Sequence, residues 1–99
     1  MLKGKQKRYL RSLAHNLQPV MQIGKSGLTD NFIHTFIDAI DTHELIKVSV
    51  LQNCMEPKEA LGEELCQKTD SDLVQIIGNQ LIFYRPTTKE NKESKIVLP

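Results

Sequence analysis

Cysteine, tryptophan and long apolar runs are scarce or missing in this 99-residue chain. It contains two cysteines, Cys54 and Cys66, and no tryptophan. Two cysteines cannot build the disulfide framework of a small secreted domain, and their C-x11-C spacing fits no zinc pattern. No stretch approaches the roughly 18 apolar residues of a membrane span, and the N-terminus lacks the apolar region of a signal peptide. We therefore expect two partly buried free thiols, no metal or cofactor, no membrane association and a cytoplasmic location.

Acidic residues are absent from the first 29 positions, which hold six basic residues; the first acidic residue is Asp30. The other 70 positions hold 7 basic and 12 acidic residues, so the formal net charge of +1 hides a strong asymmetry. Such segregation favours one face that binds a polyanion and another face kept away from it. Nucleic acid is the first candidate for that polyanion.

Apolar periodicity predicts a single α/β domain. Apolar residues at helical spacing, with Pro19 as a stop signal, predict a helix from about Gly4 to Leu17. Thr29 is a suitable N-cap for a second helix, and Gly78-Asn79 is a hairpin turn between two β-rich runs. The order α-β-α-β-α-β-β predicts a four-stranded mixed sheet with three helices in one domain, residues 1–99. The predicted strands are Val20–Ile23, Leu45–Leu51, Leu73–Ile77 and Gln80–Arg85, and the other two helices span about 29–42 and 57–67. Residues 86–99 are predicted to form a flexible polar tail. Within this tail, Ile96–Leu98 either forms a last strand or frays.

Two finer expectations concern burial. In the second strand, Lys47 and Ser49 alternate with apolar residues, which predicts one buried and one polar face. In the third helix, we expect an apolar inner face and an acidic outer face. The inner face comprises Ala60, Leu61 and Leu65, and the outer face Glu56, Glu59, Glu63 and Glu64.

A glycine-flanked loop, Gly24-Lys25-Ser26-Gly27, follows the first strand. Its glycines allow a close approach of backbone to ligand, and Lys25 and Ser26 supply a cation and a hydrogen-bond donor. A Walker P-loop is excluded because it needs a glycine where this chain has Pro19. The loop matches the GXXG pattern with which KH domains clamp a nucleic-acid backbone. We therefore predict phosphate contacts from Gly24, Lys25, Ser26 and Gly27.

The first helix carries the second candidate surface. Arg8, Arg11 and His15 recur every three or four residues opposite the apolar stripe. No acidic neighbour pairs with them, so the cluster repels itself unless a polyanion neutralises it. We predict RNA contacts from Arg8, Arg11 and His15, and also from Lys5 and Lys7. No nucleophile and base can be paired from the sequence, so we expect no catalytic residues and no enzyme.

Aromatic residues make up 5% of the chain, and Phe32 and Phe36 belong to a helix core stripe. Few rings remain to stack on bases, and the aromatic signature of RRM domains is missing. We therefore expect recognition of backbone and shape, which favours structured RNA over sequence-specific single strands.

Five sequence blocks stand out when taken in order: Lys5–Arg11, Ala14-His15 with Leu17, Gln22–Leu28, His43–Val48 and Val74–Gly78. Together they resemble the CRM domain, the chloroplast RNA splicing and ribosome maturation domain, in its single-domain bacterial YhbY-type form. The resemblance covers about residues 2 to 85. It implies a fold like the C-terminal domain of bacterial initiation factor three and RNA binding through the GXXG loop and the neighbouring basic surface. It also implies association with ribosomal RNA in large-subunit precursors.

We therefore expect a monomeric RNA-binding protein that assists assembly of the large ribosomal subunit and has no small-molecule substrate. One alternative is a general RNA chaperone or splicing-type factor. Another is a protein-interaction module whose acidic third helix docks a basic ribosomal protein. A phosphate-handling enzyme would need a catalytic base and a deep pocket, and the sequence indicates neither.

Overall fold

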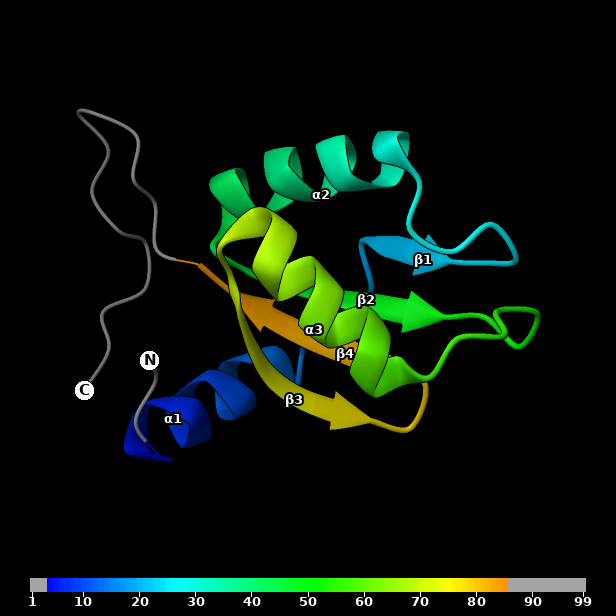
Figure 1. The fold of residues 1–99 in the computed structure, drawn as a ribbon. Helices are drawn as coiled ribbons and strands as arrows, with labels where there is room; N and C mark the ends of the chain where they lie inside the picture. Colours follow the sequence, from blue (N-terminus) through cyan, green and yellow to red (C-terminus); the bar gives the residue numbers. More distant parts are fainter. Residues whose placement is uncertain (1–3, 86–99) are drawn as a thin grey trace.

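The computed structural model describes residues 4–85, which form three helices and four strands (Figure 1). The expected order is confirmed, and boundaries differ by a few residues. The predicted flexible tail, with its strand at Ile96–Leu98, lies outside the described residues. The elements are α1 (Gly4–Ala14), β1 (Met21–Ile23), α2 (Asp30–His43), β2 (Leu45–Val50), α3 (Lys58–Thr69), β3 (Asp72–Ile77) and β4 (Gln80–Tyr84).

The four strands form one mixed sheet in the order β1-β2-β4-β3. β1 runs parallel to β2, and β4 is antiparallel to both β2 and β3. The strand that comes last in the described chain therefore lies inside the sheet, between β2 and β3. Because β1 and β2 are parallel, the loops that follow them emerge at the same edge of the sheet (Figure 1).

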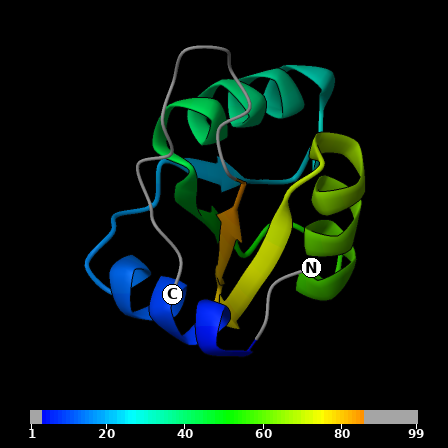
Figure 2. The same ribbon diagram turned by 90° about the vertical axis from the view of Figure 1, so that its left-hand side faces the viewer.

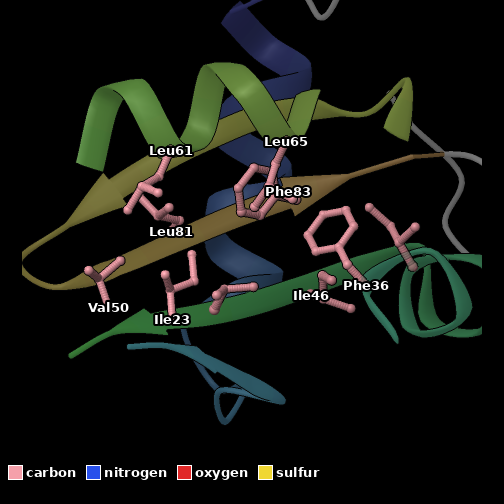
Figure 3. Close-up of a cluster of buried hydrophobic side chains, with 10 residues drawn as sticks. Ile23, Phe36, Ile46, Val50, Leu61, Leu65, Leu81 and Phe83 are labelled. Carbon is pink, nitrogen blue, oxygen red and sulfur yellow. The ribbon is translucent and has the colours of Figure 1, made fainter. Parts of the chain in front are cut away.

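The larger core lies between the sheet and the pair α2 and α3, which cover the same face (Figure 2). Phe36 from α2 meets Phe83 from β4 edge to face, with ring centroids 5.0 Å apart. Leu61 and Leu65 from α3 pack onto the same cluster (Figure 3). Burial of these side chains stabilises the fold by roughly 1.5–3 kcal/mol each.

Helix α1 covers the opposite face of the sheet. Leu10 and Ala14 are fully buried there in a second, smaller cluster. The helix ends at Ala14, three residues before the predicted Leu17, because the Leu17 N–H turns back onto the Ala14 carbonyl at 3.0 Å. Leu13 is 37% exposed and forms part of a pocket wall. The second cluster is completed by Leu45, Val74, Ile82 and Tyr84.

Local signals for the ends of elements are largely confirmed. Thr29 caps α2, since its hydroxyl accepts a hydrogen bond from the Phe32 N–H at 3.1 Å. Gly78 adopts φ +55° in the hairpin turn, as the Gly-Asn dipeptide predicts. Pro57 stands at the N-cap of α3, one position before the first turn in which it was expected.

The inner face of α3 was predicted wrongly at one position. Ala60 is exposed, and the buried residues are Leu61, Gly62, Leu65 and Thr69. At Gly62, α3 lies very close to β3: a Cβ at this position would be 2.9 Å from a methyl group of Leu73, so a larger residue would make the Leu73 side chain shift. The 3.6-residue helical period then turns Ala60 towards solvent.

The two cysteines are free and half-buried, as expected. Within residues 4–85, no helix combines the length and the apolar character that a membrane crossing requires.

Candidate nucleic-acid interface

The Gly24–Gly27 loop is a tight turn at the edge of the sheet where β1 and β2 end (Figure 1). The Gly27 N–H donates to the Gly24 carbonyl at 3.0 Å, which places Lys25 and Ser26 at the corners of the turn. Both corner residues are exposed. Gly27 adopts φ +66°, a conformation that glycine takes readily and other residues rarely do. The four predicted loop residues therefore form one exposed unit with a glycine where the backbone demands it.

The loop that follows β2 lies against this turn. A Cβ built at Gly24 would be 3.6 Å from Asn53 Oδ1, and one built at Gly27 would be 2.8 Å from Glu56 Oε2. Met55, near the tip, is 91% exposed. Glu56 was predicted on the outer face of the third helix, and that prediction is wrong: it precedes α3 and stands beside the glycine turn. Sequence periodicity cannot reveal a contact between two loops, so this neighbour was missed.

The basic residues of α1 occupy a different part of the molecule from the glycine turn. Figure 1 shows α1 and the turn at opposite ends of the domain. Arg8, Arg11 and His15 are exposed, as is Lys5, whereas Lys7 is half-buried. Nearness in sequence therefore does not make the two surfaces adjacent, and any ligand that contacts both must cross part of the sheet.

A row of uncharged polar residues crosses the sheet at the edge where the turn lies. Gln22 of β1 is in register with Ser49 of β2, which is in register with Gln80 of β4. Side chains alternate between faces along a strand, so Gln80 shares the α1 side of the sheet with Ile82. The row therefore offers hydrogen-bonding groups, without negative charge, on the α1 side of the sheet.

Charge is segregated between the two faces of the sheet. Helix α1 contains four basic residues and no acidic residue. Helix α2, on the other face, contains three aspartates and no lysine or arginine. Helix α3 contains three glutamates against two lysines. The asymmetry seen along the sequence is thus arranged in space, with the α1 side as the positive face.

Lys47 is the most unusual charged residue of the α1 side. It lies on β2 with only 7% of its surface exposed, so the prediction that it belongs to a polar, open face is wrong. Leu45 to Val48 are all buried because helices cover both faces of the sheet at this end of β2. Among residues 4–85, none forms an ion pair or hydrogen bond with the Lys47 side chain.

A pocket of about 480 Å³ lies beside Lys47, between α1, the segment that leads to β1, the end of α2 and the start of β2. Its walls are mostly apolar, and its polar groups come from three residues. This pocket was not predicted from the sequence; a lysine between two apolar residues of a strand, Ile46 and Val48, was the one signal that could have suggested it. The lining residues are Leu13, Leu17, Gln18, Val20, His43, Leu45, Ile46 and Lys47.

The remaining ionisable groups offer little further chemistry. Burial, helped by the nearby Asp72 carboxylate, raises the pKa of the Cys66 thiol. In the described part of the chain, no three side chains of His, Cys, Asp or Glu come together as a metal site would require.

Comparisons with known proteins give consistent matches. A family model of the CRS1 / YhbY (CRM) domain matches residues 2–85. The protein named "Probable RNA-binding protein YqeI" from Bacillus subtilis is 51% identical over 96 residues, which cover 97% of this chain and 99% of that protein. A Haemophilus influenzae protein named "RNA-binding protein" is 40% identical over 98 residues, 99% of this chain and 95% of its own length.

A solved structure matches as well. The solution structure of the hypothetical protein SAV1595 from Staphylococcus aureus, described as a candidate RNA-binding protein, superposes with a TM-score of 0.80. The two chains are 54% identical, and the match covers 100% of each.

Proposed function

The chain belongs to the CRS1/YhbY (CRM) domain family, and on this premise we propose that it is an RNA-binding protein that associates with precursors of the large ribosomal subunit. The observation that carries the proposal is the spatial segregation of charge, with basic α1 on one face of the sheet and the acidic helices on the other. Relatives named as RNA-binding proteins support the same class of ligand. The role is binding, in the cytoplasm and as a monomer, with no catalytic step.

The proposed mechanism is backbone clamping at two places. The amide groups of the Gly24–Gly27 turn and the Lys25 ammonium hold phosphates at the sheet edge, as in other GXXG loops. Arg8 and Arg11 hold a second stretch of backbone on α1. Because these sites lie at opposite ends of the domain, the ligand must present two phosphate stretches at a set separation. Folded RNA meets this requirement better than an unstructured single strand, and a ribosomal RNA junction is such a ligand.

The mechanism is tested by removing one cation from each site. We expect Lys25→Ala and Arg11→Ala each to weaken RNA binding. Each variant loses the neutralisation of one phosphate. A plot of the logarithm of the binding constant against the logarithm of salt concentration should therefore become less steep by roughly 0.7–0.9. Lys68→Ala is the matched control, because it removes one exposed cation from α3, on the other face of the sheet. Unchanged affinity of the Lys25→Ala, Arg11→Ala double variant at physiological salt would refute the clamp.

The assembly role is tested separately, by crosslinking the tagged protein to RNA in cells and sequencing the bound fragments. We expect a sharp peak in precursor large-subunit RNA. Fragments spread over many transcripts would replace the assembly role with that of a general RNA chaperone or a splicing-type factor.

A protein-binding role is the second candidate, because exposed carboxylates gather on α3. Glu59 and Glu63 are exposed, and Glu64 pairs with Lys68 at 3.1 Å. A basic ribosomal protein is a complementary partner for this surface. Under this alternative, the Glu59→Gln, Glu63→Gln variant would lose association with the precursor particle while Lys25→Ala would retain it.

A further inference from the structure

We propose that the pocket beside Lys47 takes up one unpaired, unstacked base of the bound RNA, and that Lys47 favours guanine in this position. The inference rests on the proposed RNA binding and deepens it, since backbone clamping alone carries no sequence information. It gives the domain one base-specific contact in addition to its phosphate contacts.

The pocket has the size and wall chemistry of a ligand site. Its volume of about 480 Å³ falls within the roughly 300–1,000 Å³ of such sites, which is ample for one nucleobase. Leu13, Leu17 and Val20 form apolar walls on the side of α1 and the segment that follows it. Leu45 and Ile46 contribute from β2. Aliphatic walls of this kind can enclose the faces of a planar ring without any aromatic side chain.

Lys47 is a charge without a partner inside this pocket. Lysine is seldom buried unless it is paired, because an ammonium group removed from water needs compensating hydrogen bonds. Here 7% of the residue is exposed, and no described residue supplies an acceptor for its side chain; its ammonium nitrogen is not a buried unpaired atom, so it keeps contact with solvent at the pocket. The acceptor must therefore come from water or from a ligand that enters the pocket.

The position of the pocket favours RNA as the source of that acceptor. Leu13 belongs to α1, on which Arg11 is exposed, and Leu17 follows His15 by two positions. Leu13 belongs to the apolar stripe of α1, opposite Arg11 and His15, so RNA held by these residues reaches the pocket around the C-terminal end of the helix.

The donor chemistry of lysine explains the preference for guanine. An ammonium group has three donors and no acceptor. Guanine presents two adjacent acceptors, O6 and N7, and lysine contact with them is a common specific interaction in nucleic-acid recognition. Adenine places a donor next to its N7, so this edge offers lysine one acceptor where guanine offers two. Gln18, also in the lining, can serve either a donor or an acceptor elsewhere on the ring.

The test uses the full chain and four RNA hairpins that differ only in the identity of one unpaired nucleotide. We expect the unchanged protein to bind the hairpin with unpaired guanine about tenfold more tightly than the others. Lys47→Met keeps the length and apolar character of the side chain, and we expect it to bring the four dissociation constants together. Lys25→Ala is the matched control: it should weaken all four hairpins equally and preserve their ratio.

A second variant keeps the test decisive if Lys47→Met folds poorly. Val20 is 50% exposed at the rim, so Val20→Phe narrows the pocket without replacing Lys47. We expect it to weaken the hairpin with unpaired guanine more than a fully paired hairpin. In NMR spectra of the unchanged protein, the methyl signals of Leu13, Leu17 and Val20 should shift when the hairpin with unpaired guanine is added. They should not shift when the fully paired hairpin is added.

Each contrary outcome has its own meaning. Binding of all four hairpins with equal affinity, or a guanine preference that survives Lys47→Met, would overturn the base pocket and leave the RNA-binding proposal standing. Absence of any RNA binding would overturn both. If Leu98→Ser shifts the Leu13 and Val20 methyl signals without RNA, the terminal segment of the chain fills the pocket and the inference is wrong.

Discussion

The carboxylate of Glu56 lies directly against Gly27, so close that a Cβ at Gly27 would be 2.8 Å from Glu56 Oε2. A negative charge therefore stands beside the turn to which we assign phosphate binding. At a separation of about 4 Å, two like charges repel by about 1 kcal/mol in water. The domain thus carries a charge that opposes its own proposed ligand at the point of contact.

Replacement of Glu56 by glutamine should raise RNA affinity. We expect Glu56→Gln to tighten binding by about two- to fivefold at low salt, since an exposed like charge contributes up to about 1 kcal/mol, and less at high salt. Filter binding across a salt series measures the effect. Glu63→Gln removes a charge from the outer face of α3 and is expected to change little. Equal effects of the two variants would argue against phosphate binding at the turn.

Gly27→Ala should destabilise the protein, whereas Gly24→Ala should not. Gly27 has φ +66°, and a left-handed conformation costs a non-glycine residue about 1–2 kcal/mol. The added Cβ must also displace the flexible end of Glu56. At Gly24 the nearest atoms would be 3.6 Å from the Cβ, an ordinary contact distance. Urea unfolding of both variants gives the comparison, and equal midpoints would contradict this account of the turn.

The Arg85–Asp41 ion pair should contribute strongly to stability. Each side chain is 16% exposed, and Arg85 also donates through Nη1 to the Thr69 carbonyl at 2.8 Å. The Arg85 side chain, directly after β4, thus contacts both α2 and α3. We expect Asp41→Asn to cost about 2–4 kcal/mol in unfolding free energy, because it leaves a mostly buried cation without its partner.

The exposed Glu64–Lys68 pair provides the control for that measurement. Its side chains are 45% and 50% exposed, so Glu64→Gln should cost no more than about 0.5 kcal/mol. Chemical denaturation of both variants under the same conditions measures the loss of unfolding free energy in each. A destabilisation by Asp41→Asn as small as that by Glu64→Gln would mean that the Arg85 link is energetically minor.

Stability should fall at alkaline pH because of Cys66. Its pKa is raised in the folded state by burial and by Asp72, so the unfolded chain loses this proton at a lower pH than the native protein. The stabilising contribution is complete below the unfolded thiol pKa, about 8.5, and is lost as the pH rises towards the folded value. Cys66→Ala should flatten the decline of unfolding free energy above this pH. Cys54→Ala, which leaves Cys66 in place, should retain it.

The sequence was a good guide to the fold because its strongest signals are local. Hydrophobic period, the Thr29 cap and the Gly78-Asn79 turn act within a few residues, and the helices and strands appear where these signals predict them. The family resemblance is also confirmed by the match over residues 2–85. The order of the strands was beyond such signals, because a period identifies a strand without identifying its partner.

In the candidate site too, local features could be predicted from the sequence, and features that depend on distant segments could not. The Gly24–Gly27 turn could be located from its glycines, and the exposure of Arg8 and Arg11 from helical spacing. Their separation across the domain could not, since it depends on the face of the sheet that α1 covers. Glu56 and Lys47 were misjudged because their surroundings come from distant segments: a neighbouring loop for Glu56, and α1 with its following segment for Lys47. RNA contact by the predicted residues stays a prediction.

The interior position of β4 has a consequence for synthesis of the protein. Residues 80–84 join β2 to β3, so a nascent chain that has not yet released them from the ribosome cannot assemble the sheet. Because synthesis proceeds from the N-terminus, α1 and the glycine turn emerge first, without the framework that sets their separation. A chain that stops short of Gln80 would carry both basic segments and still be unable to hold them at a fixed separation.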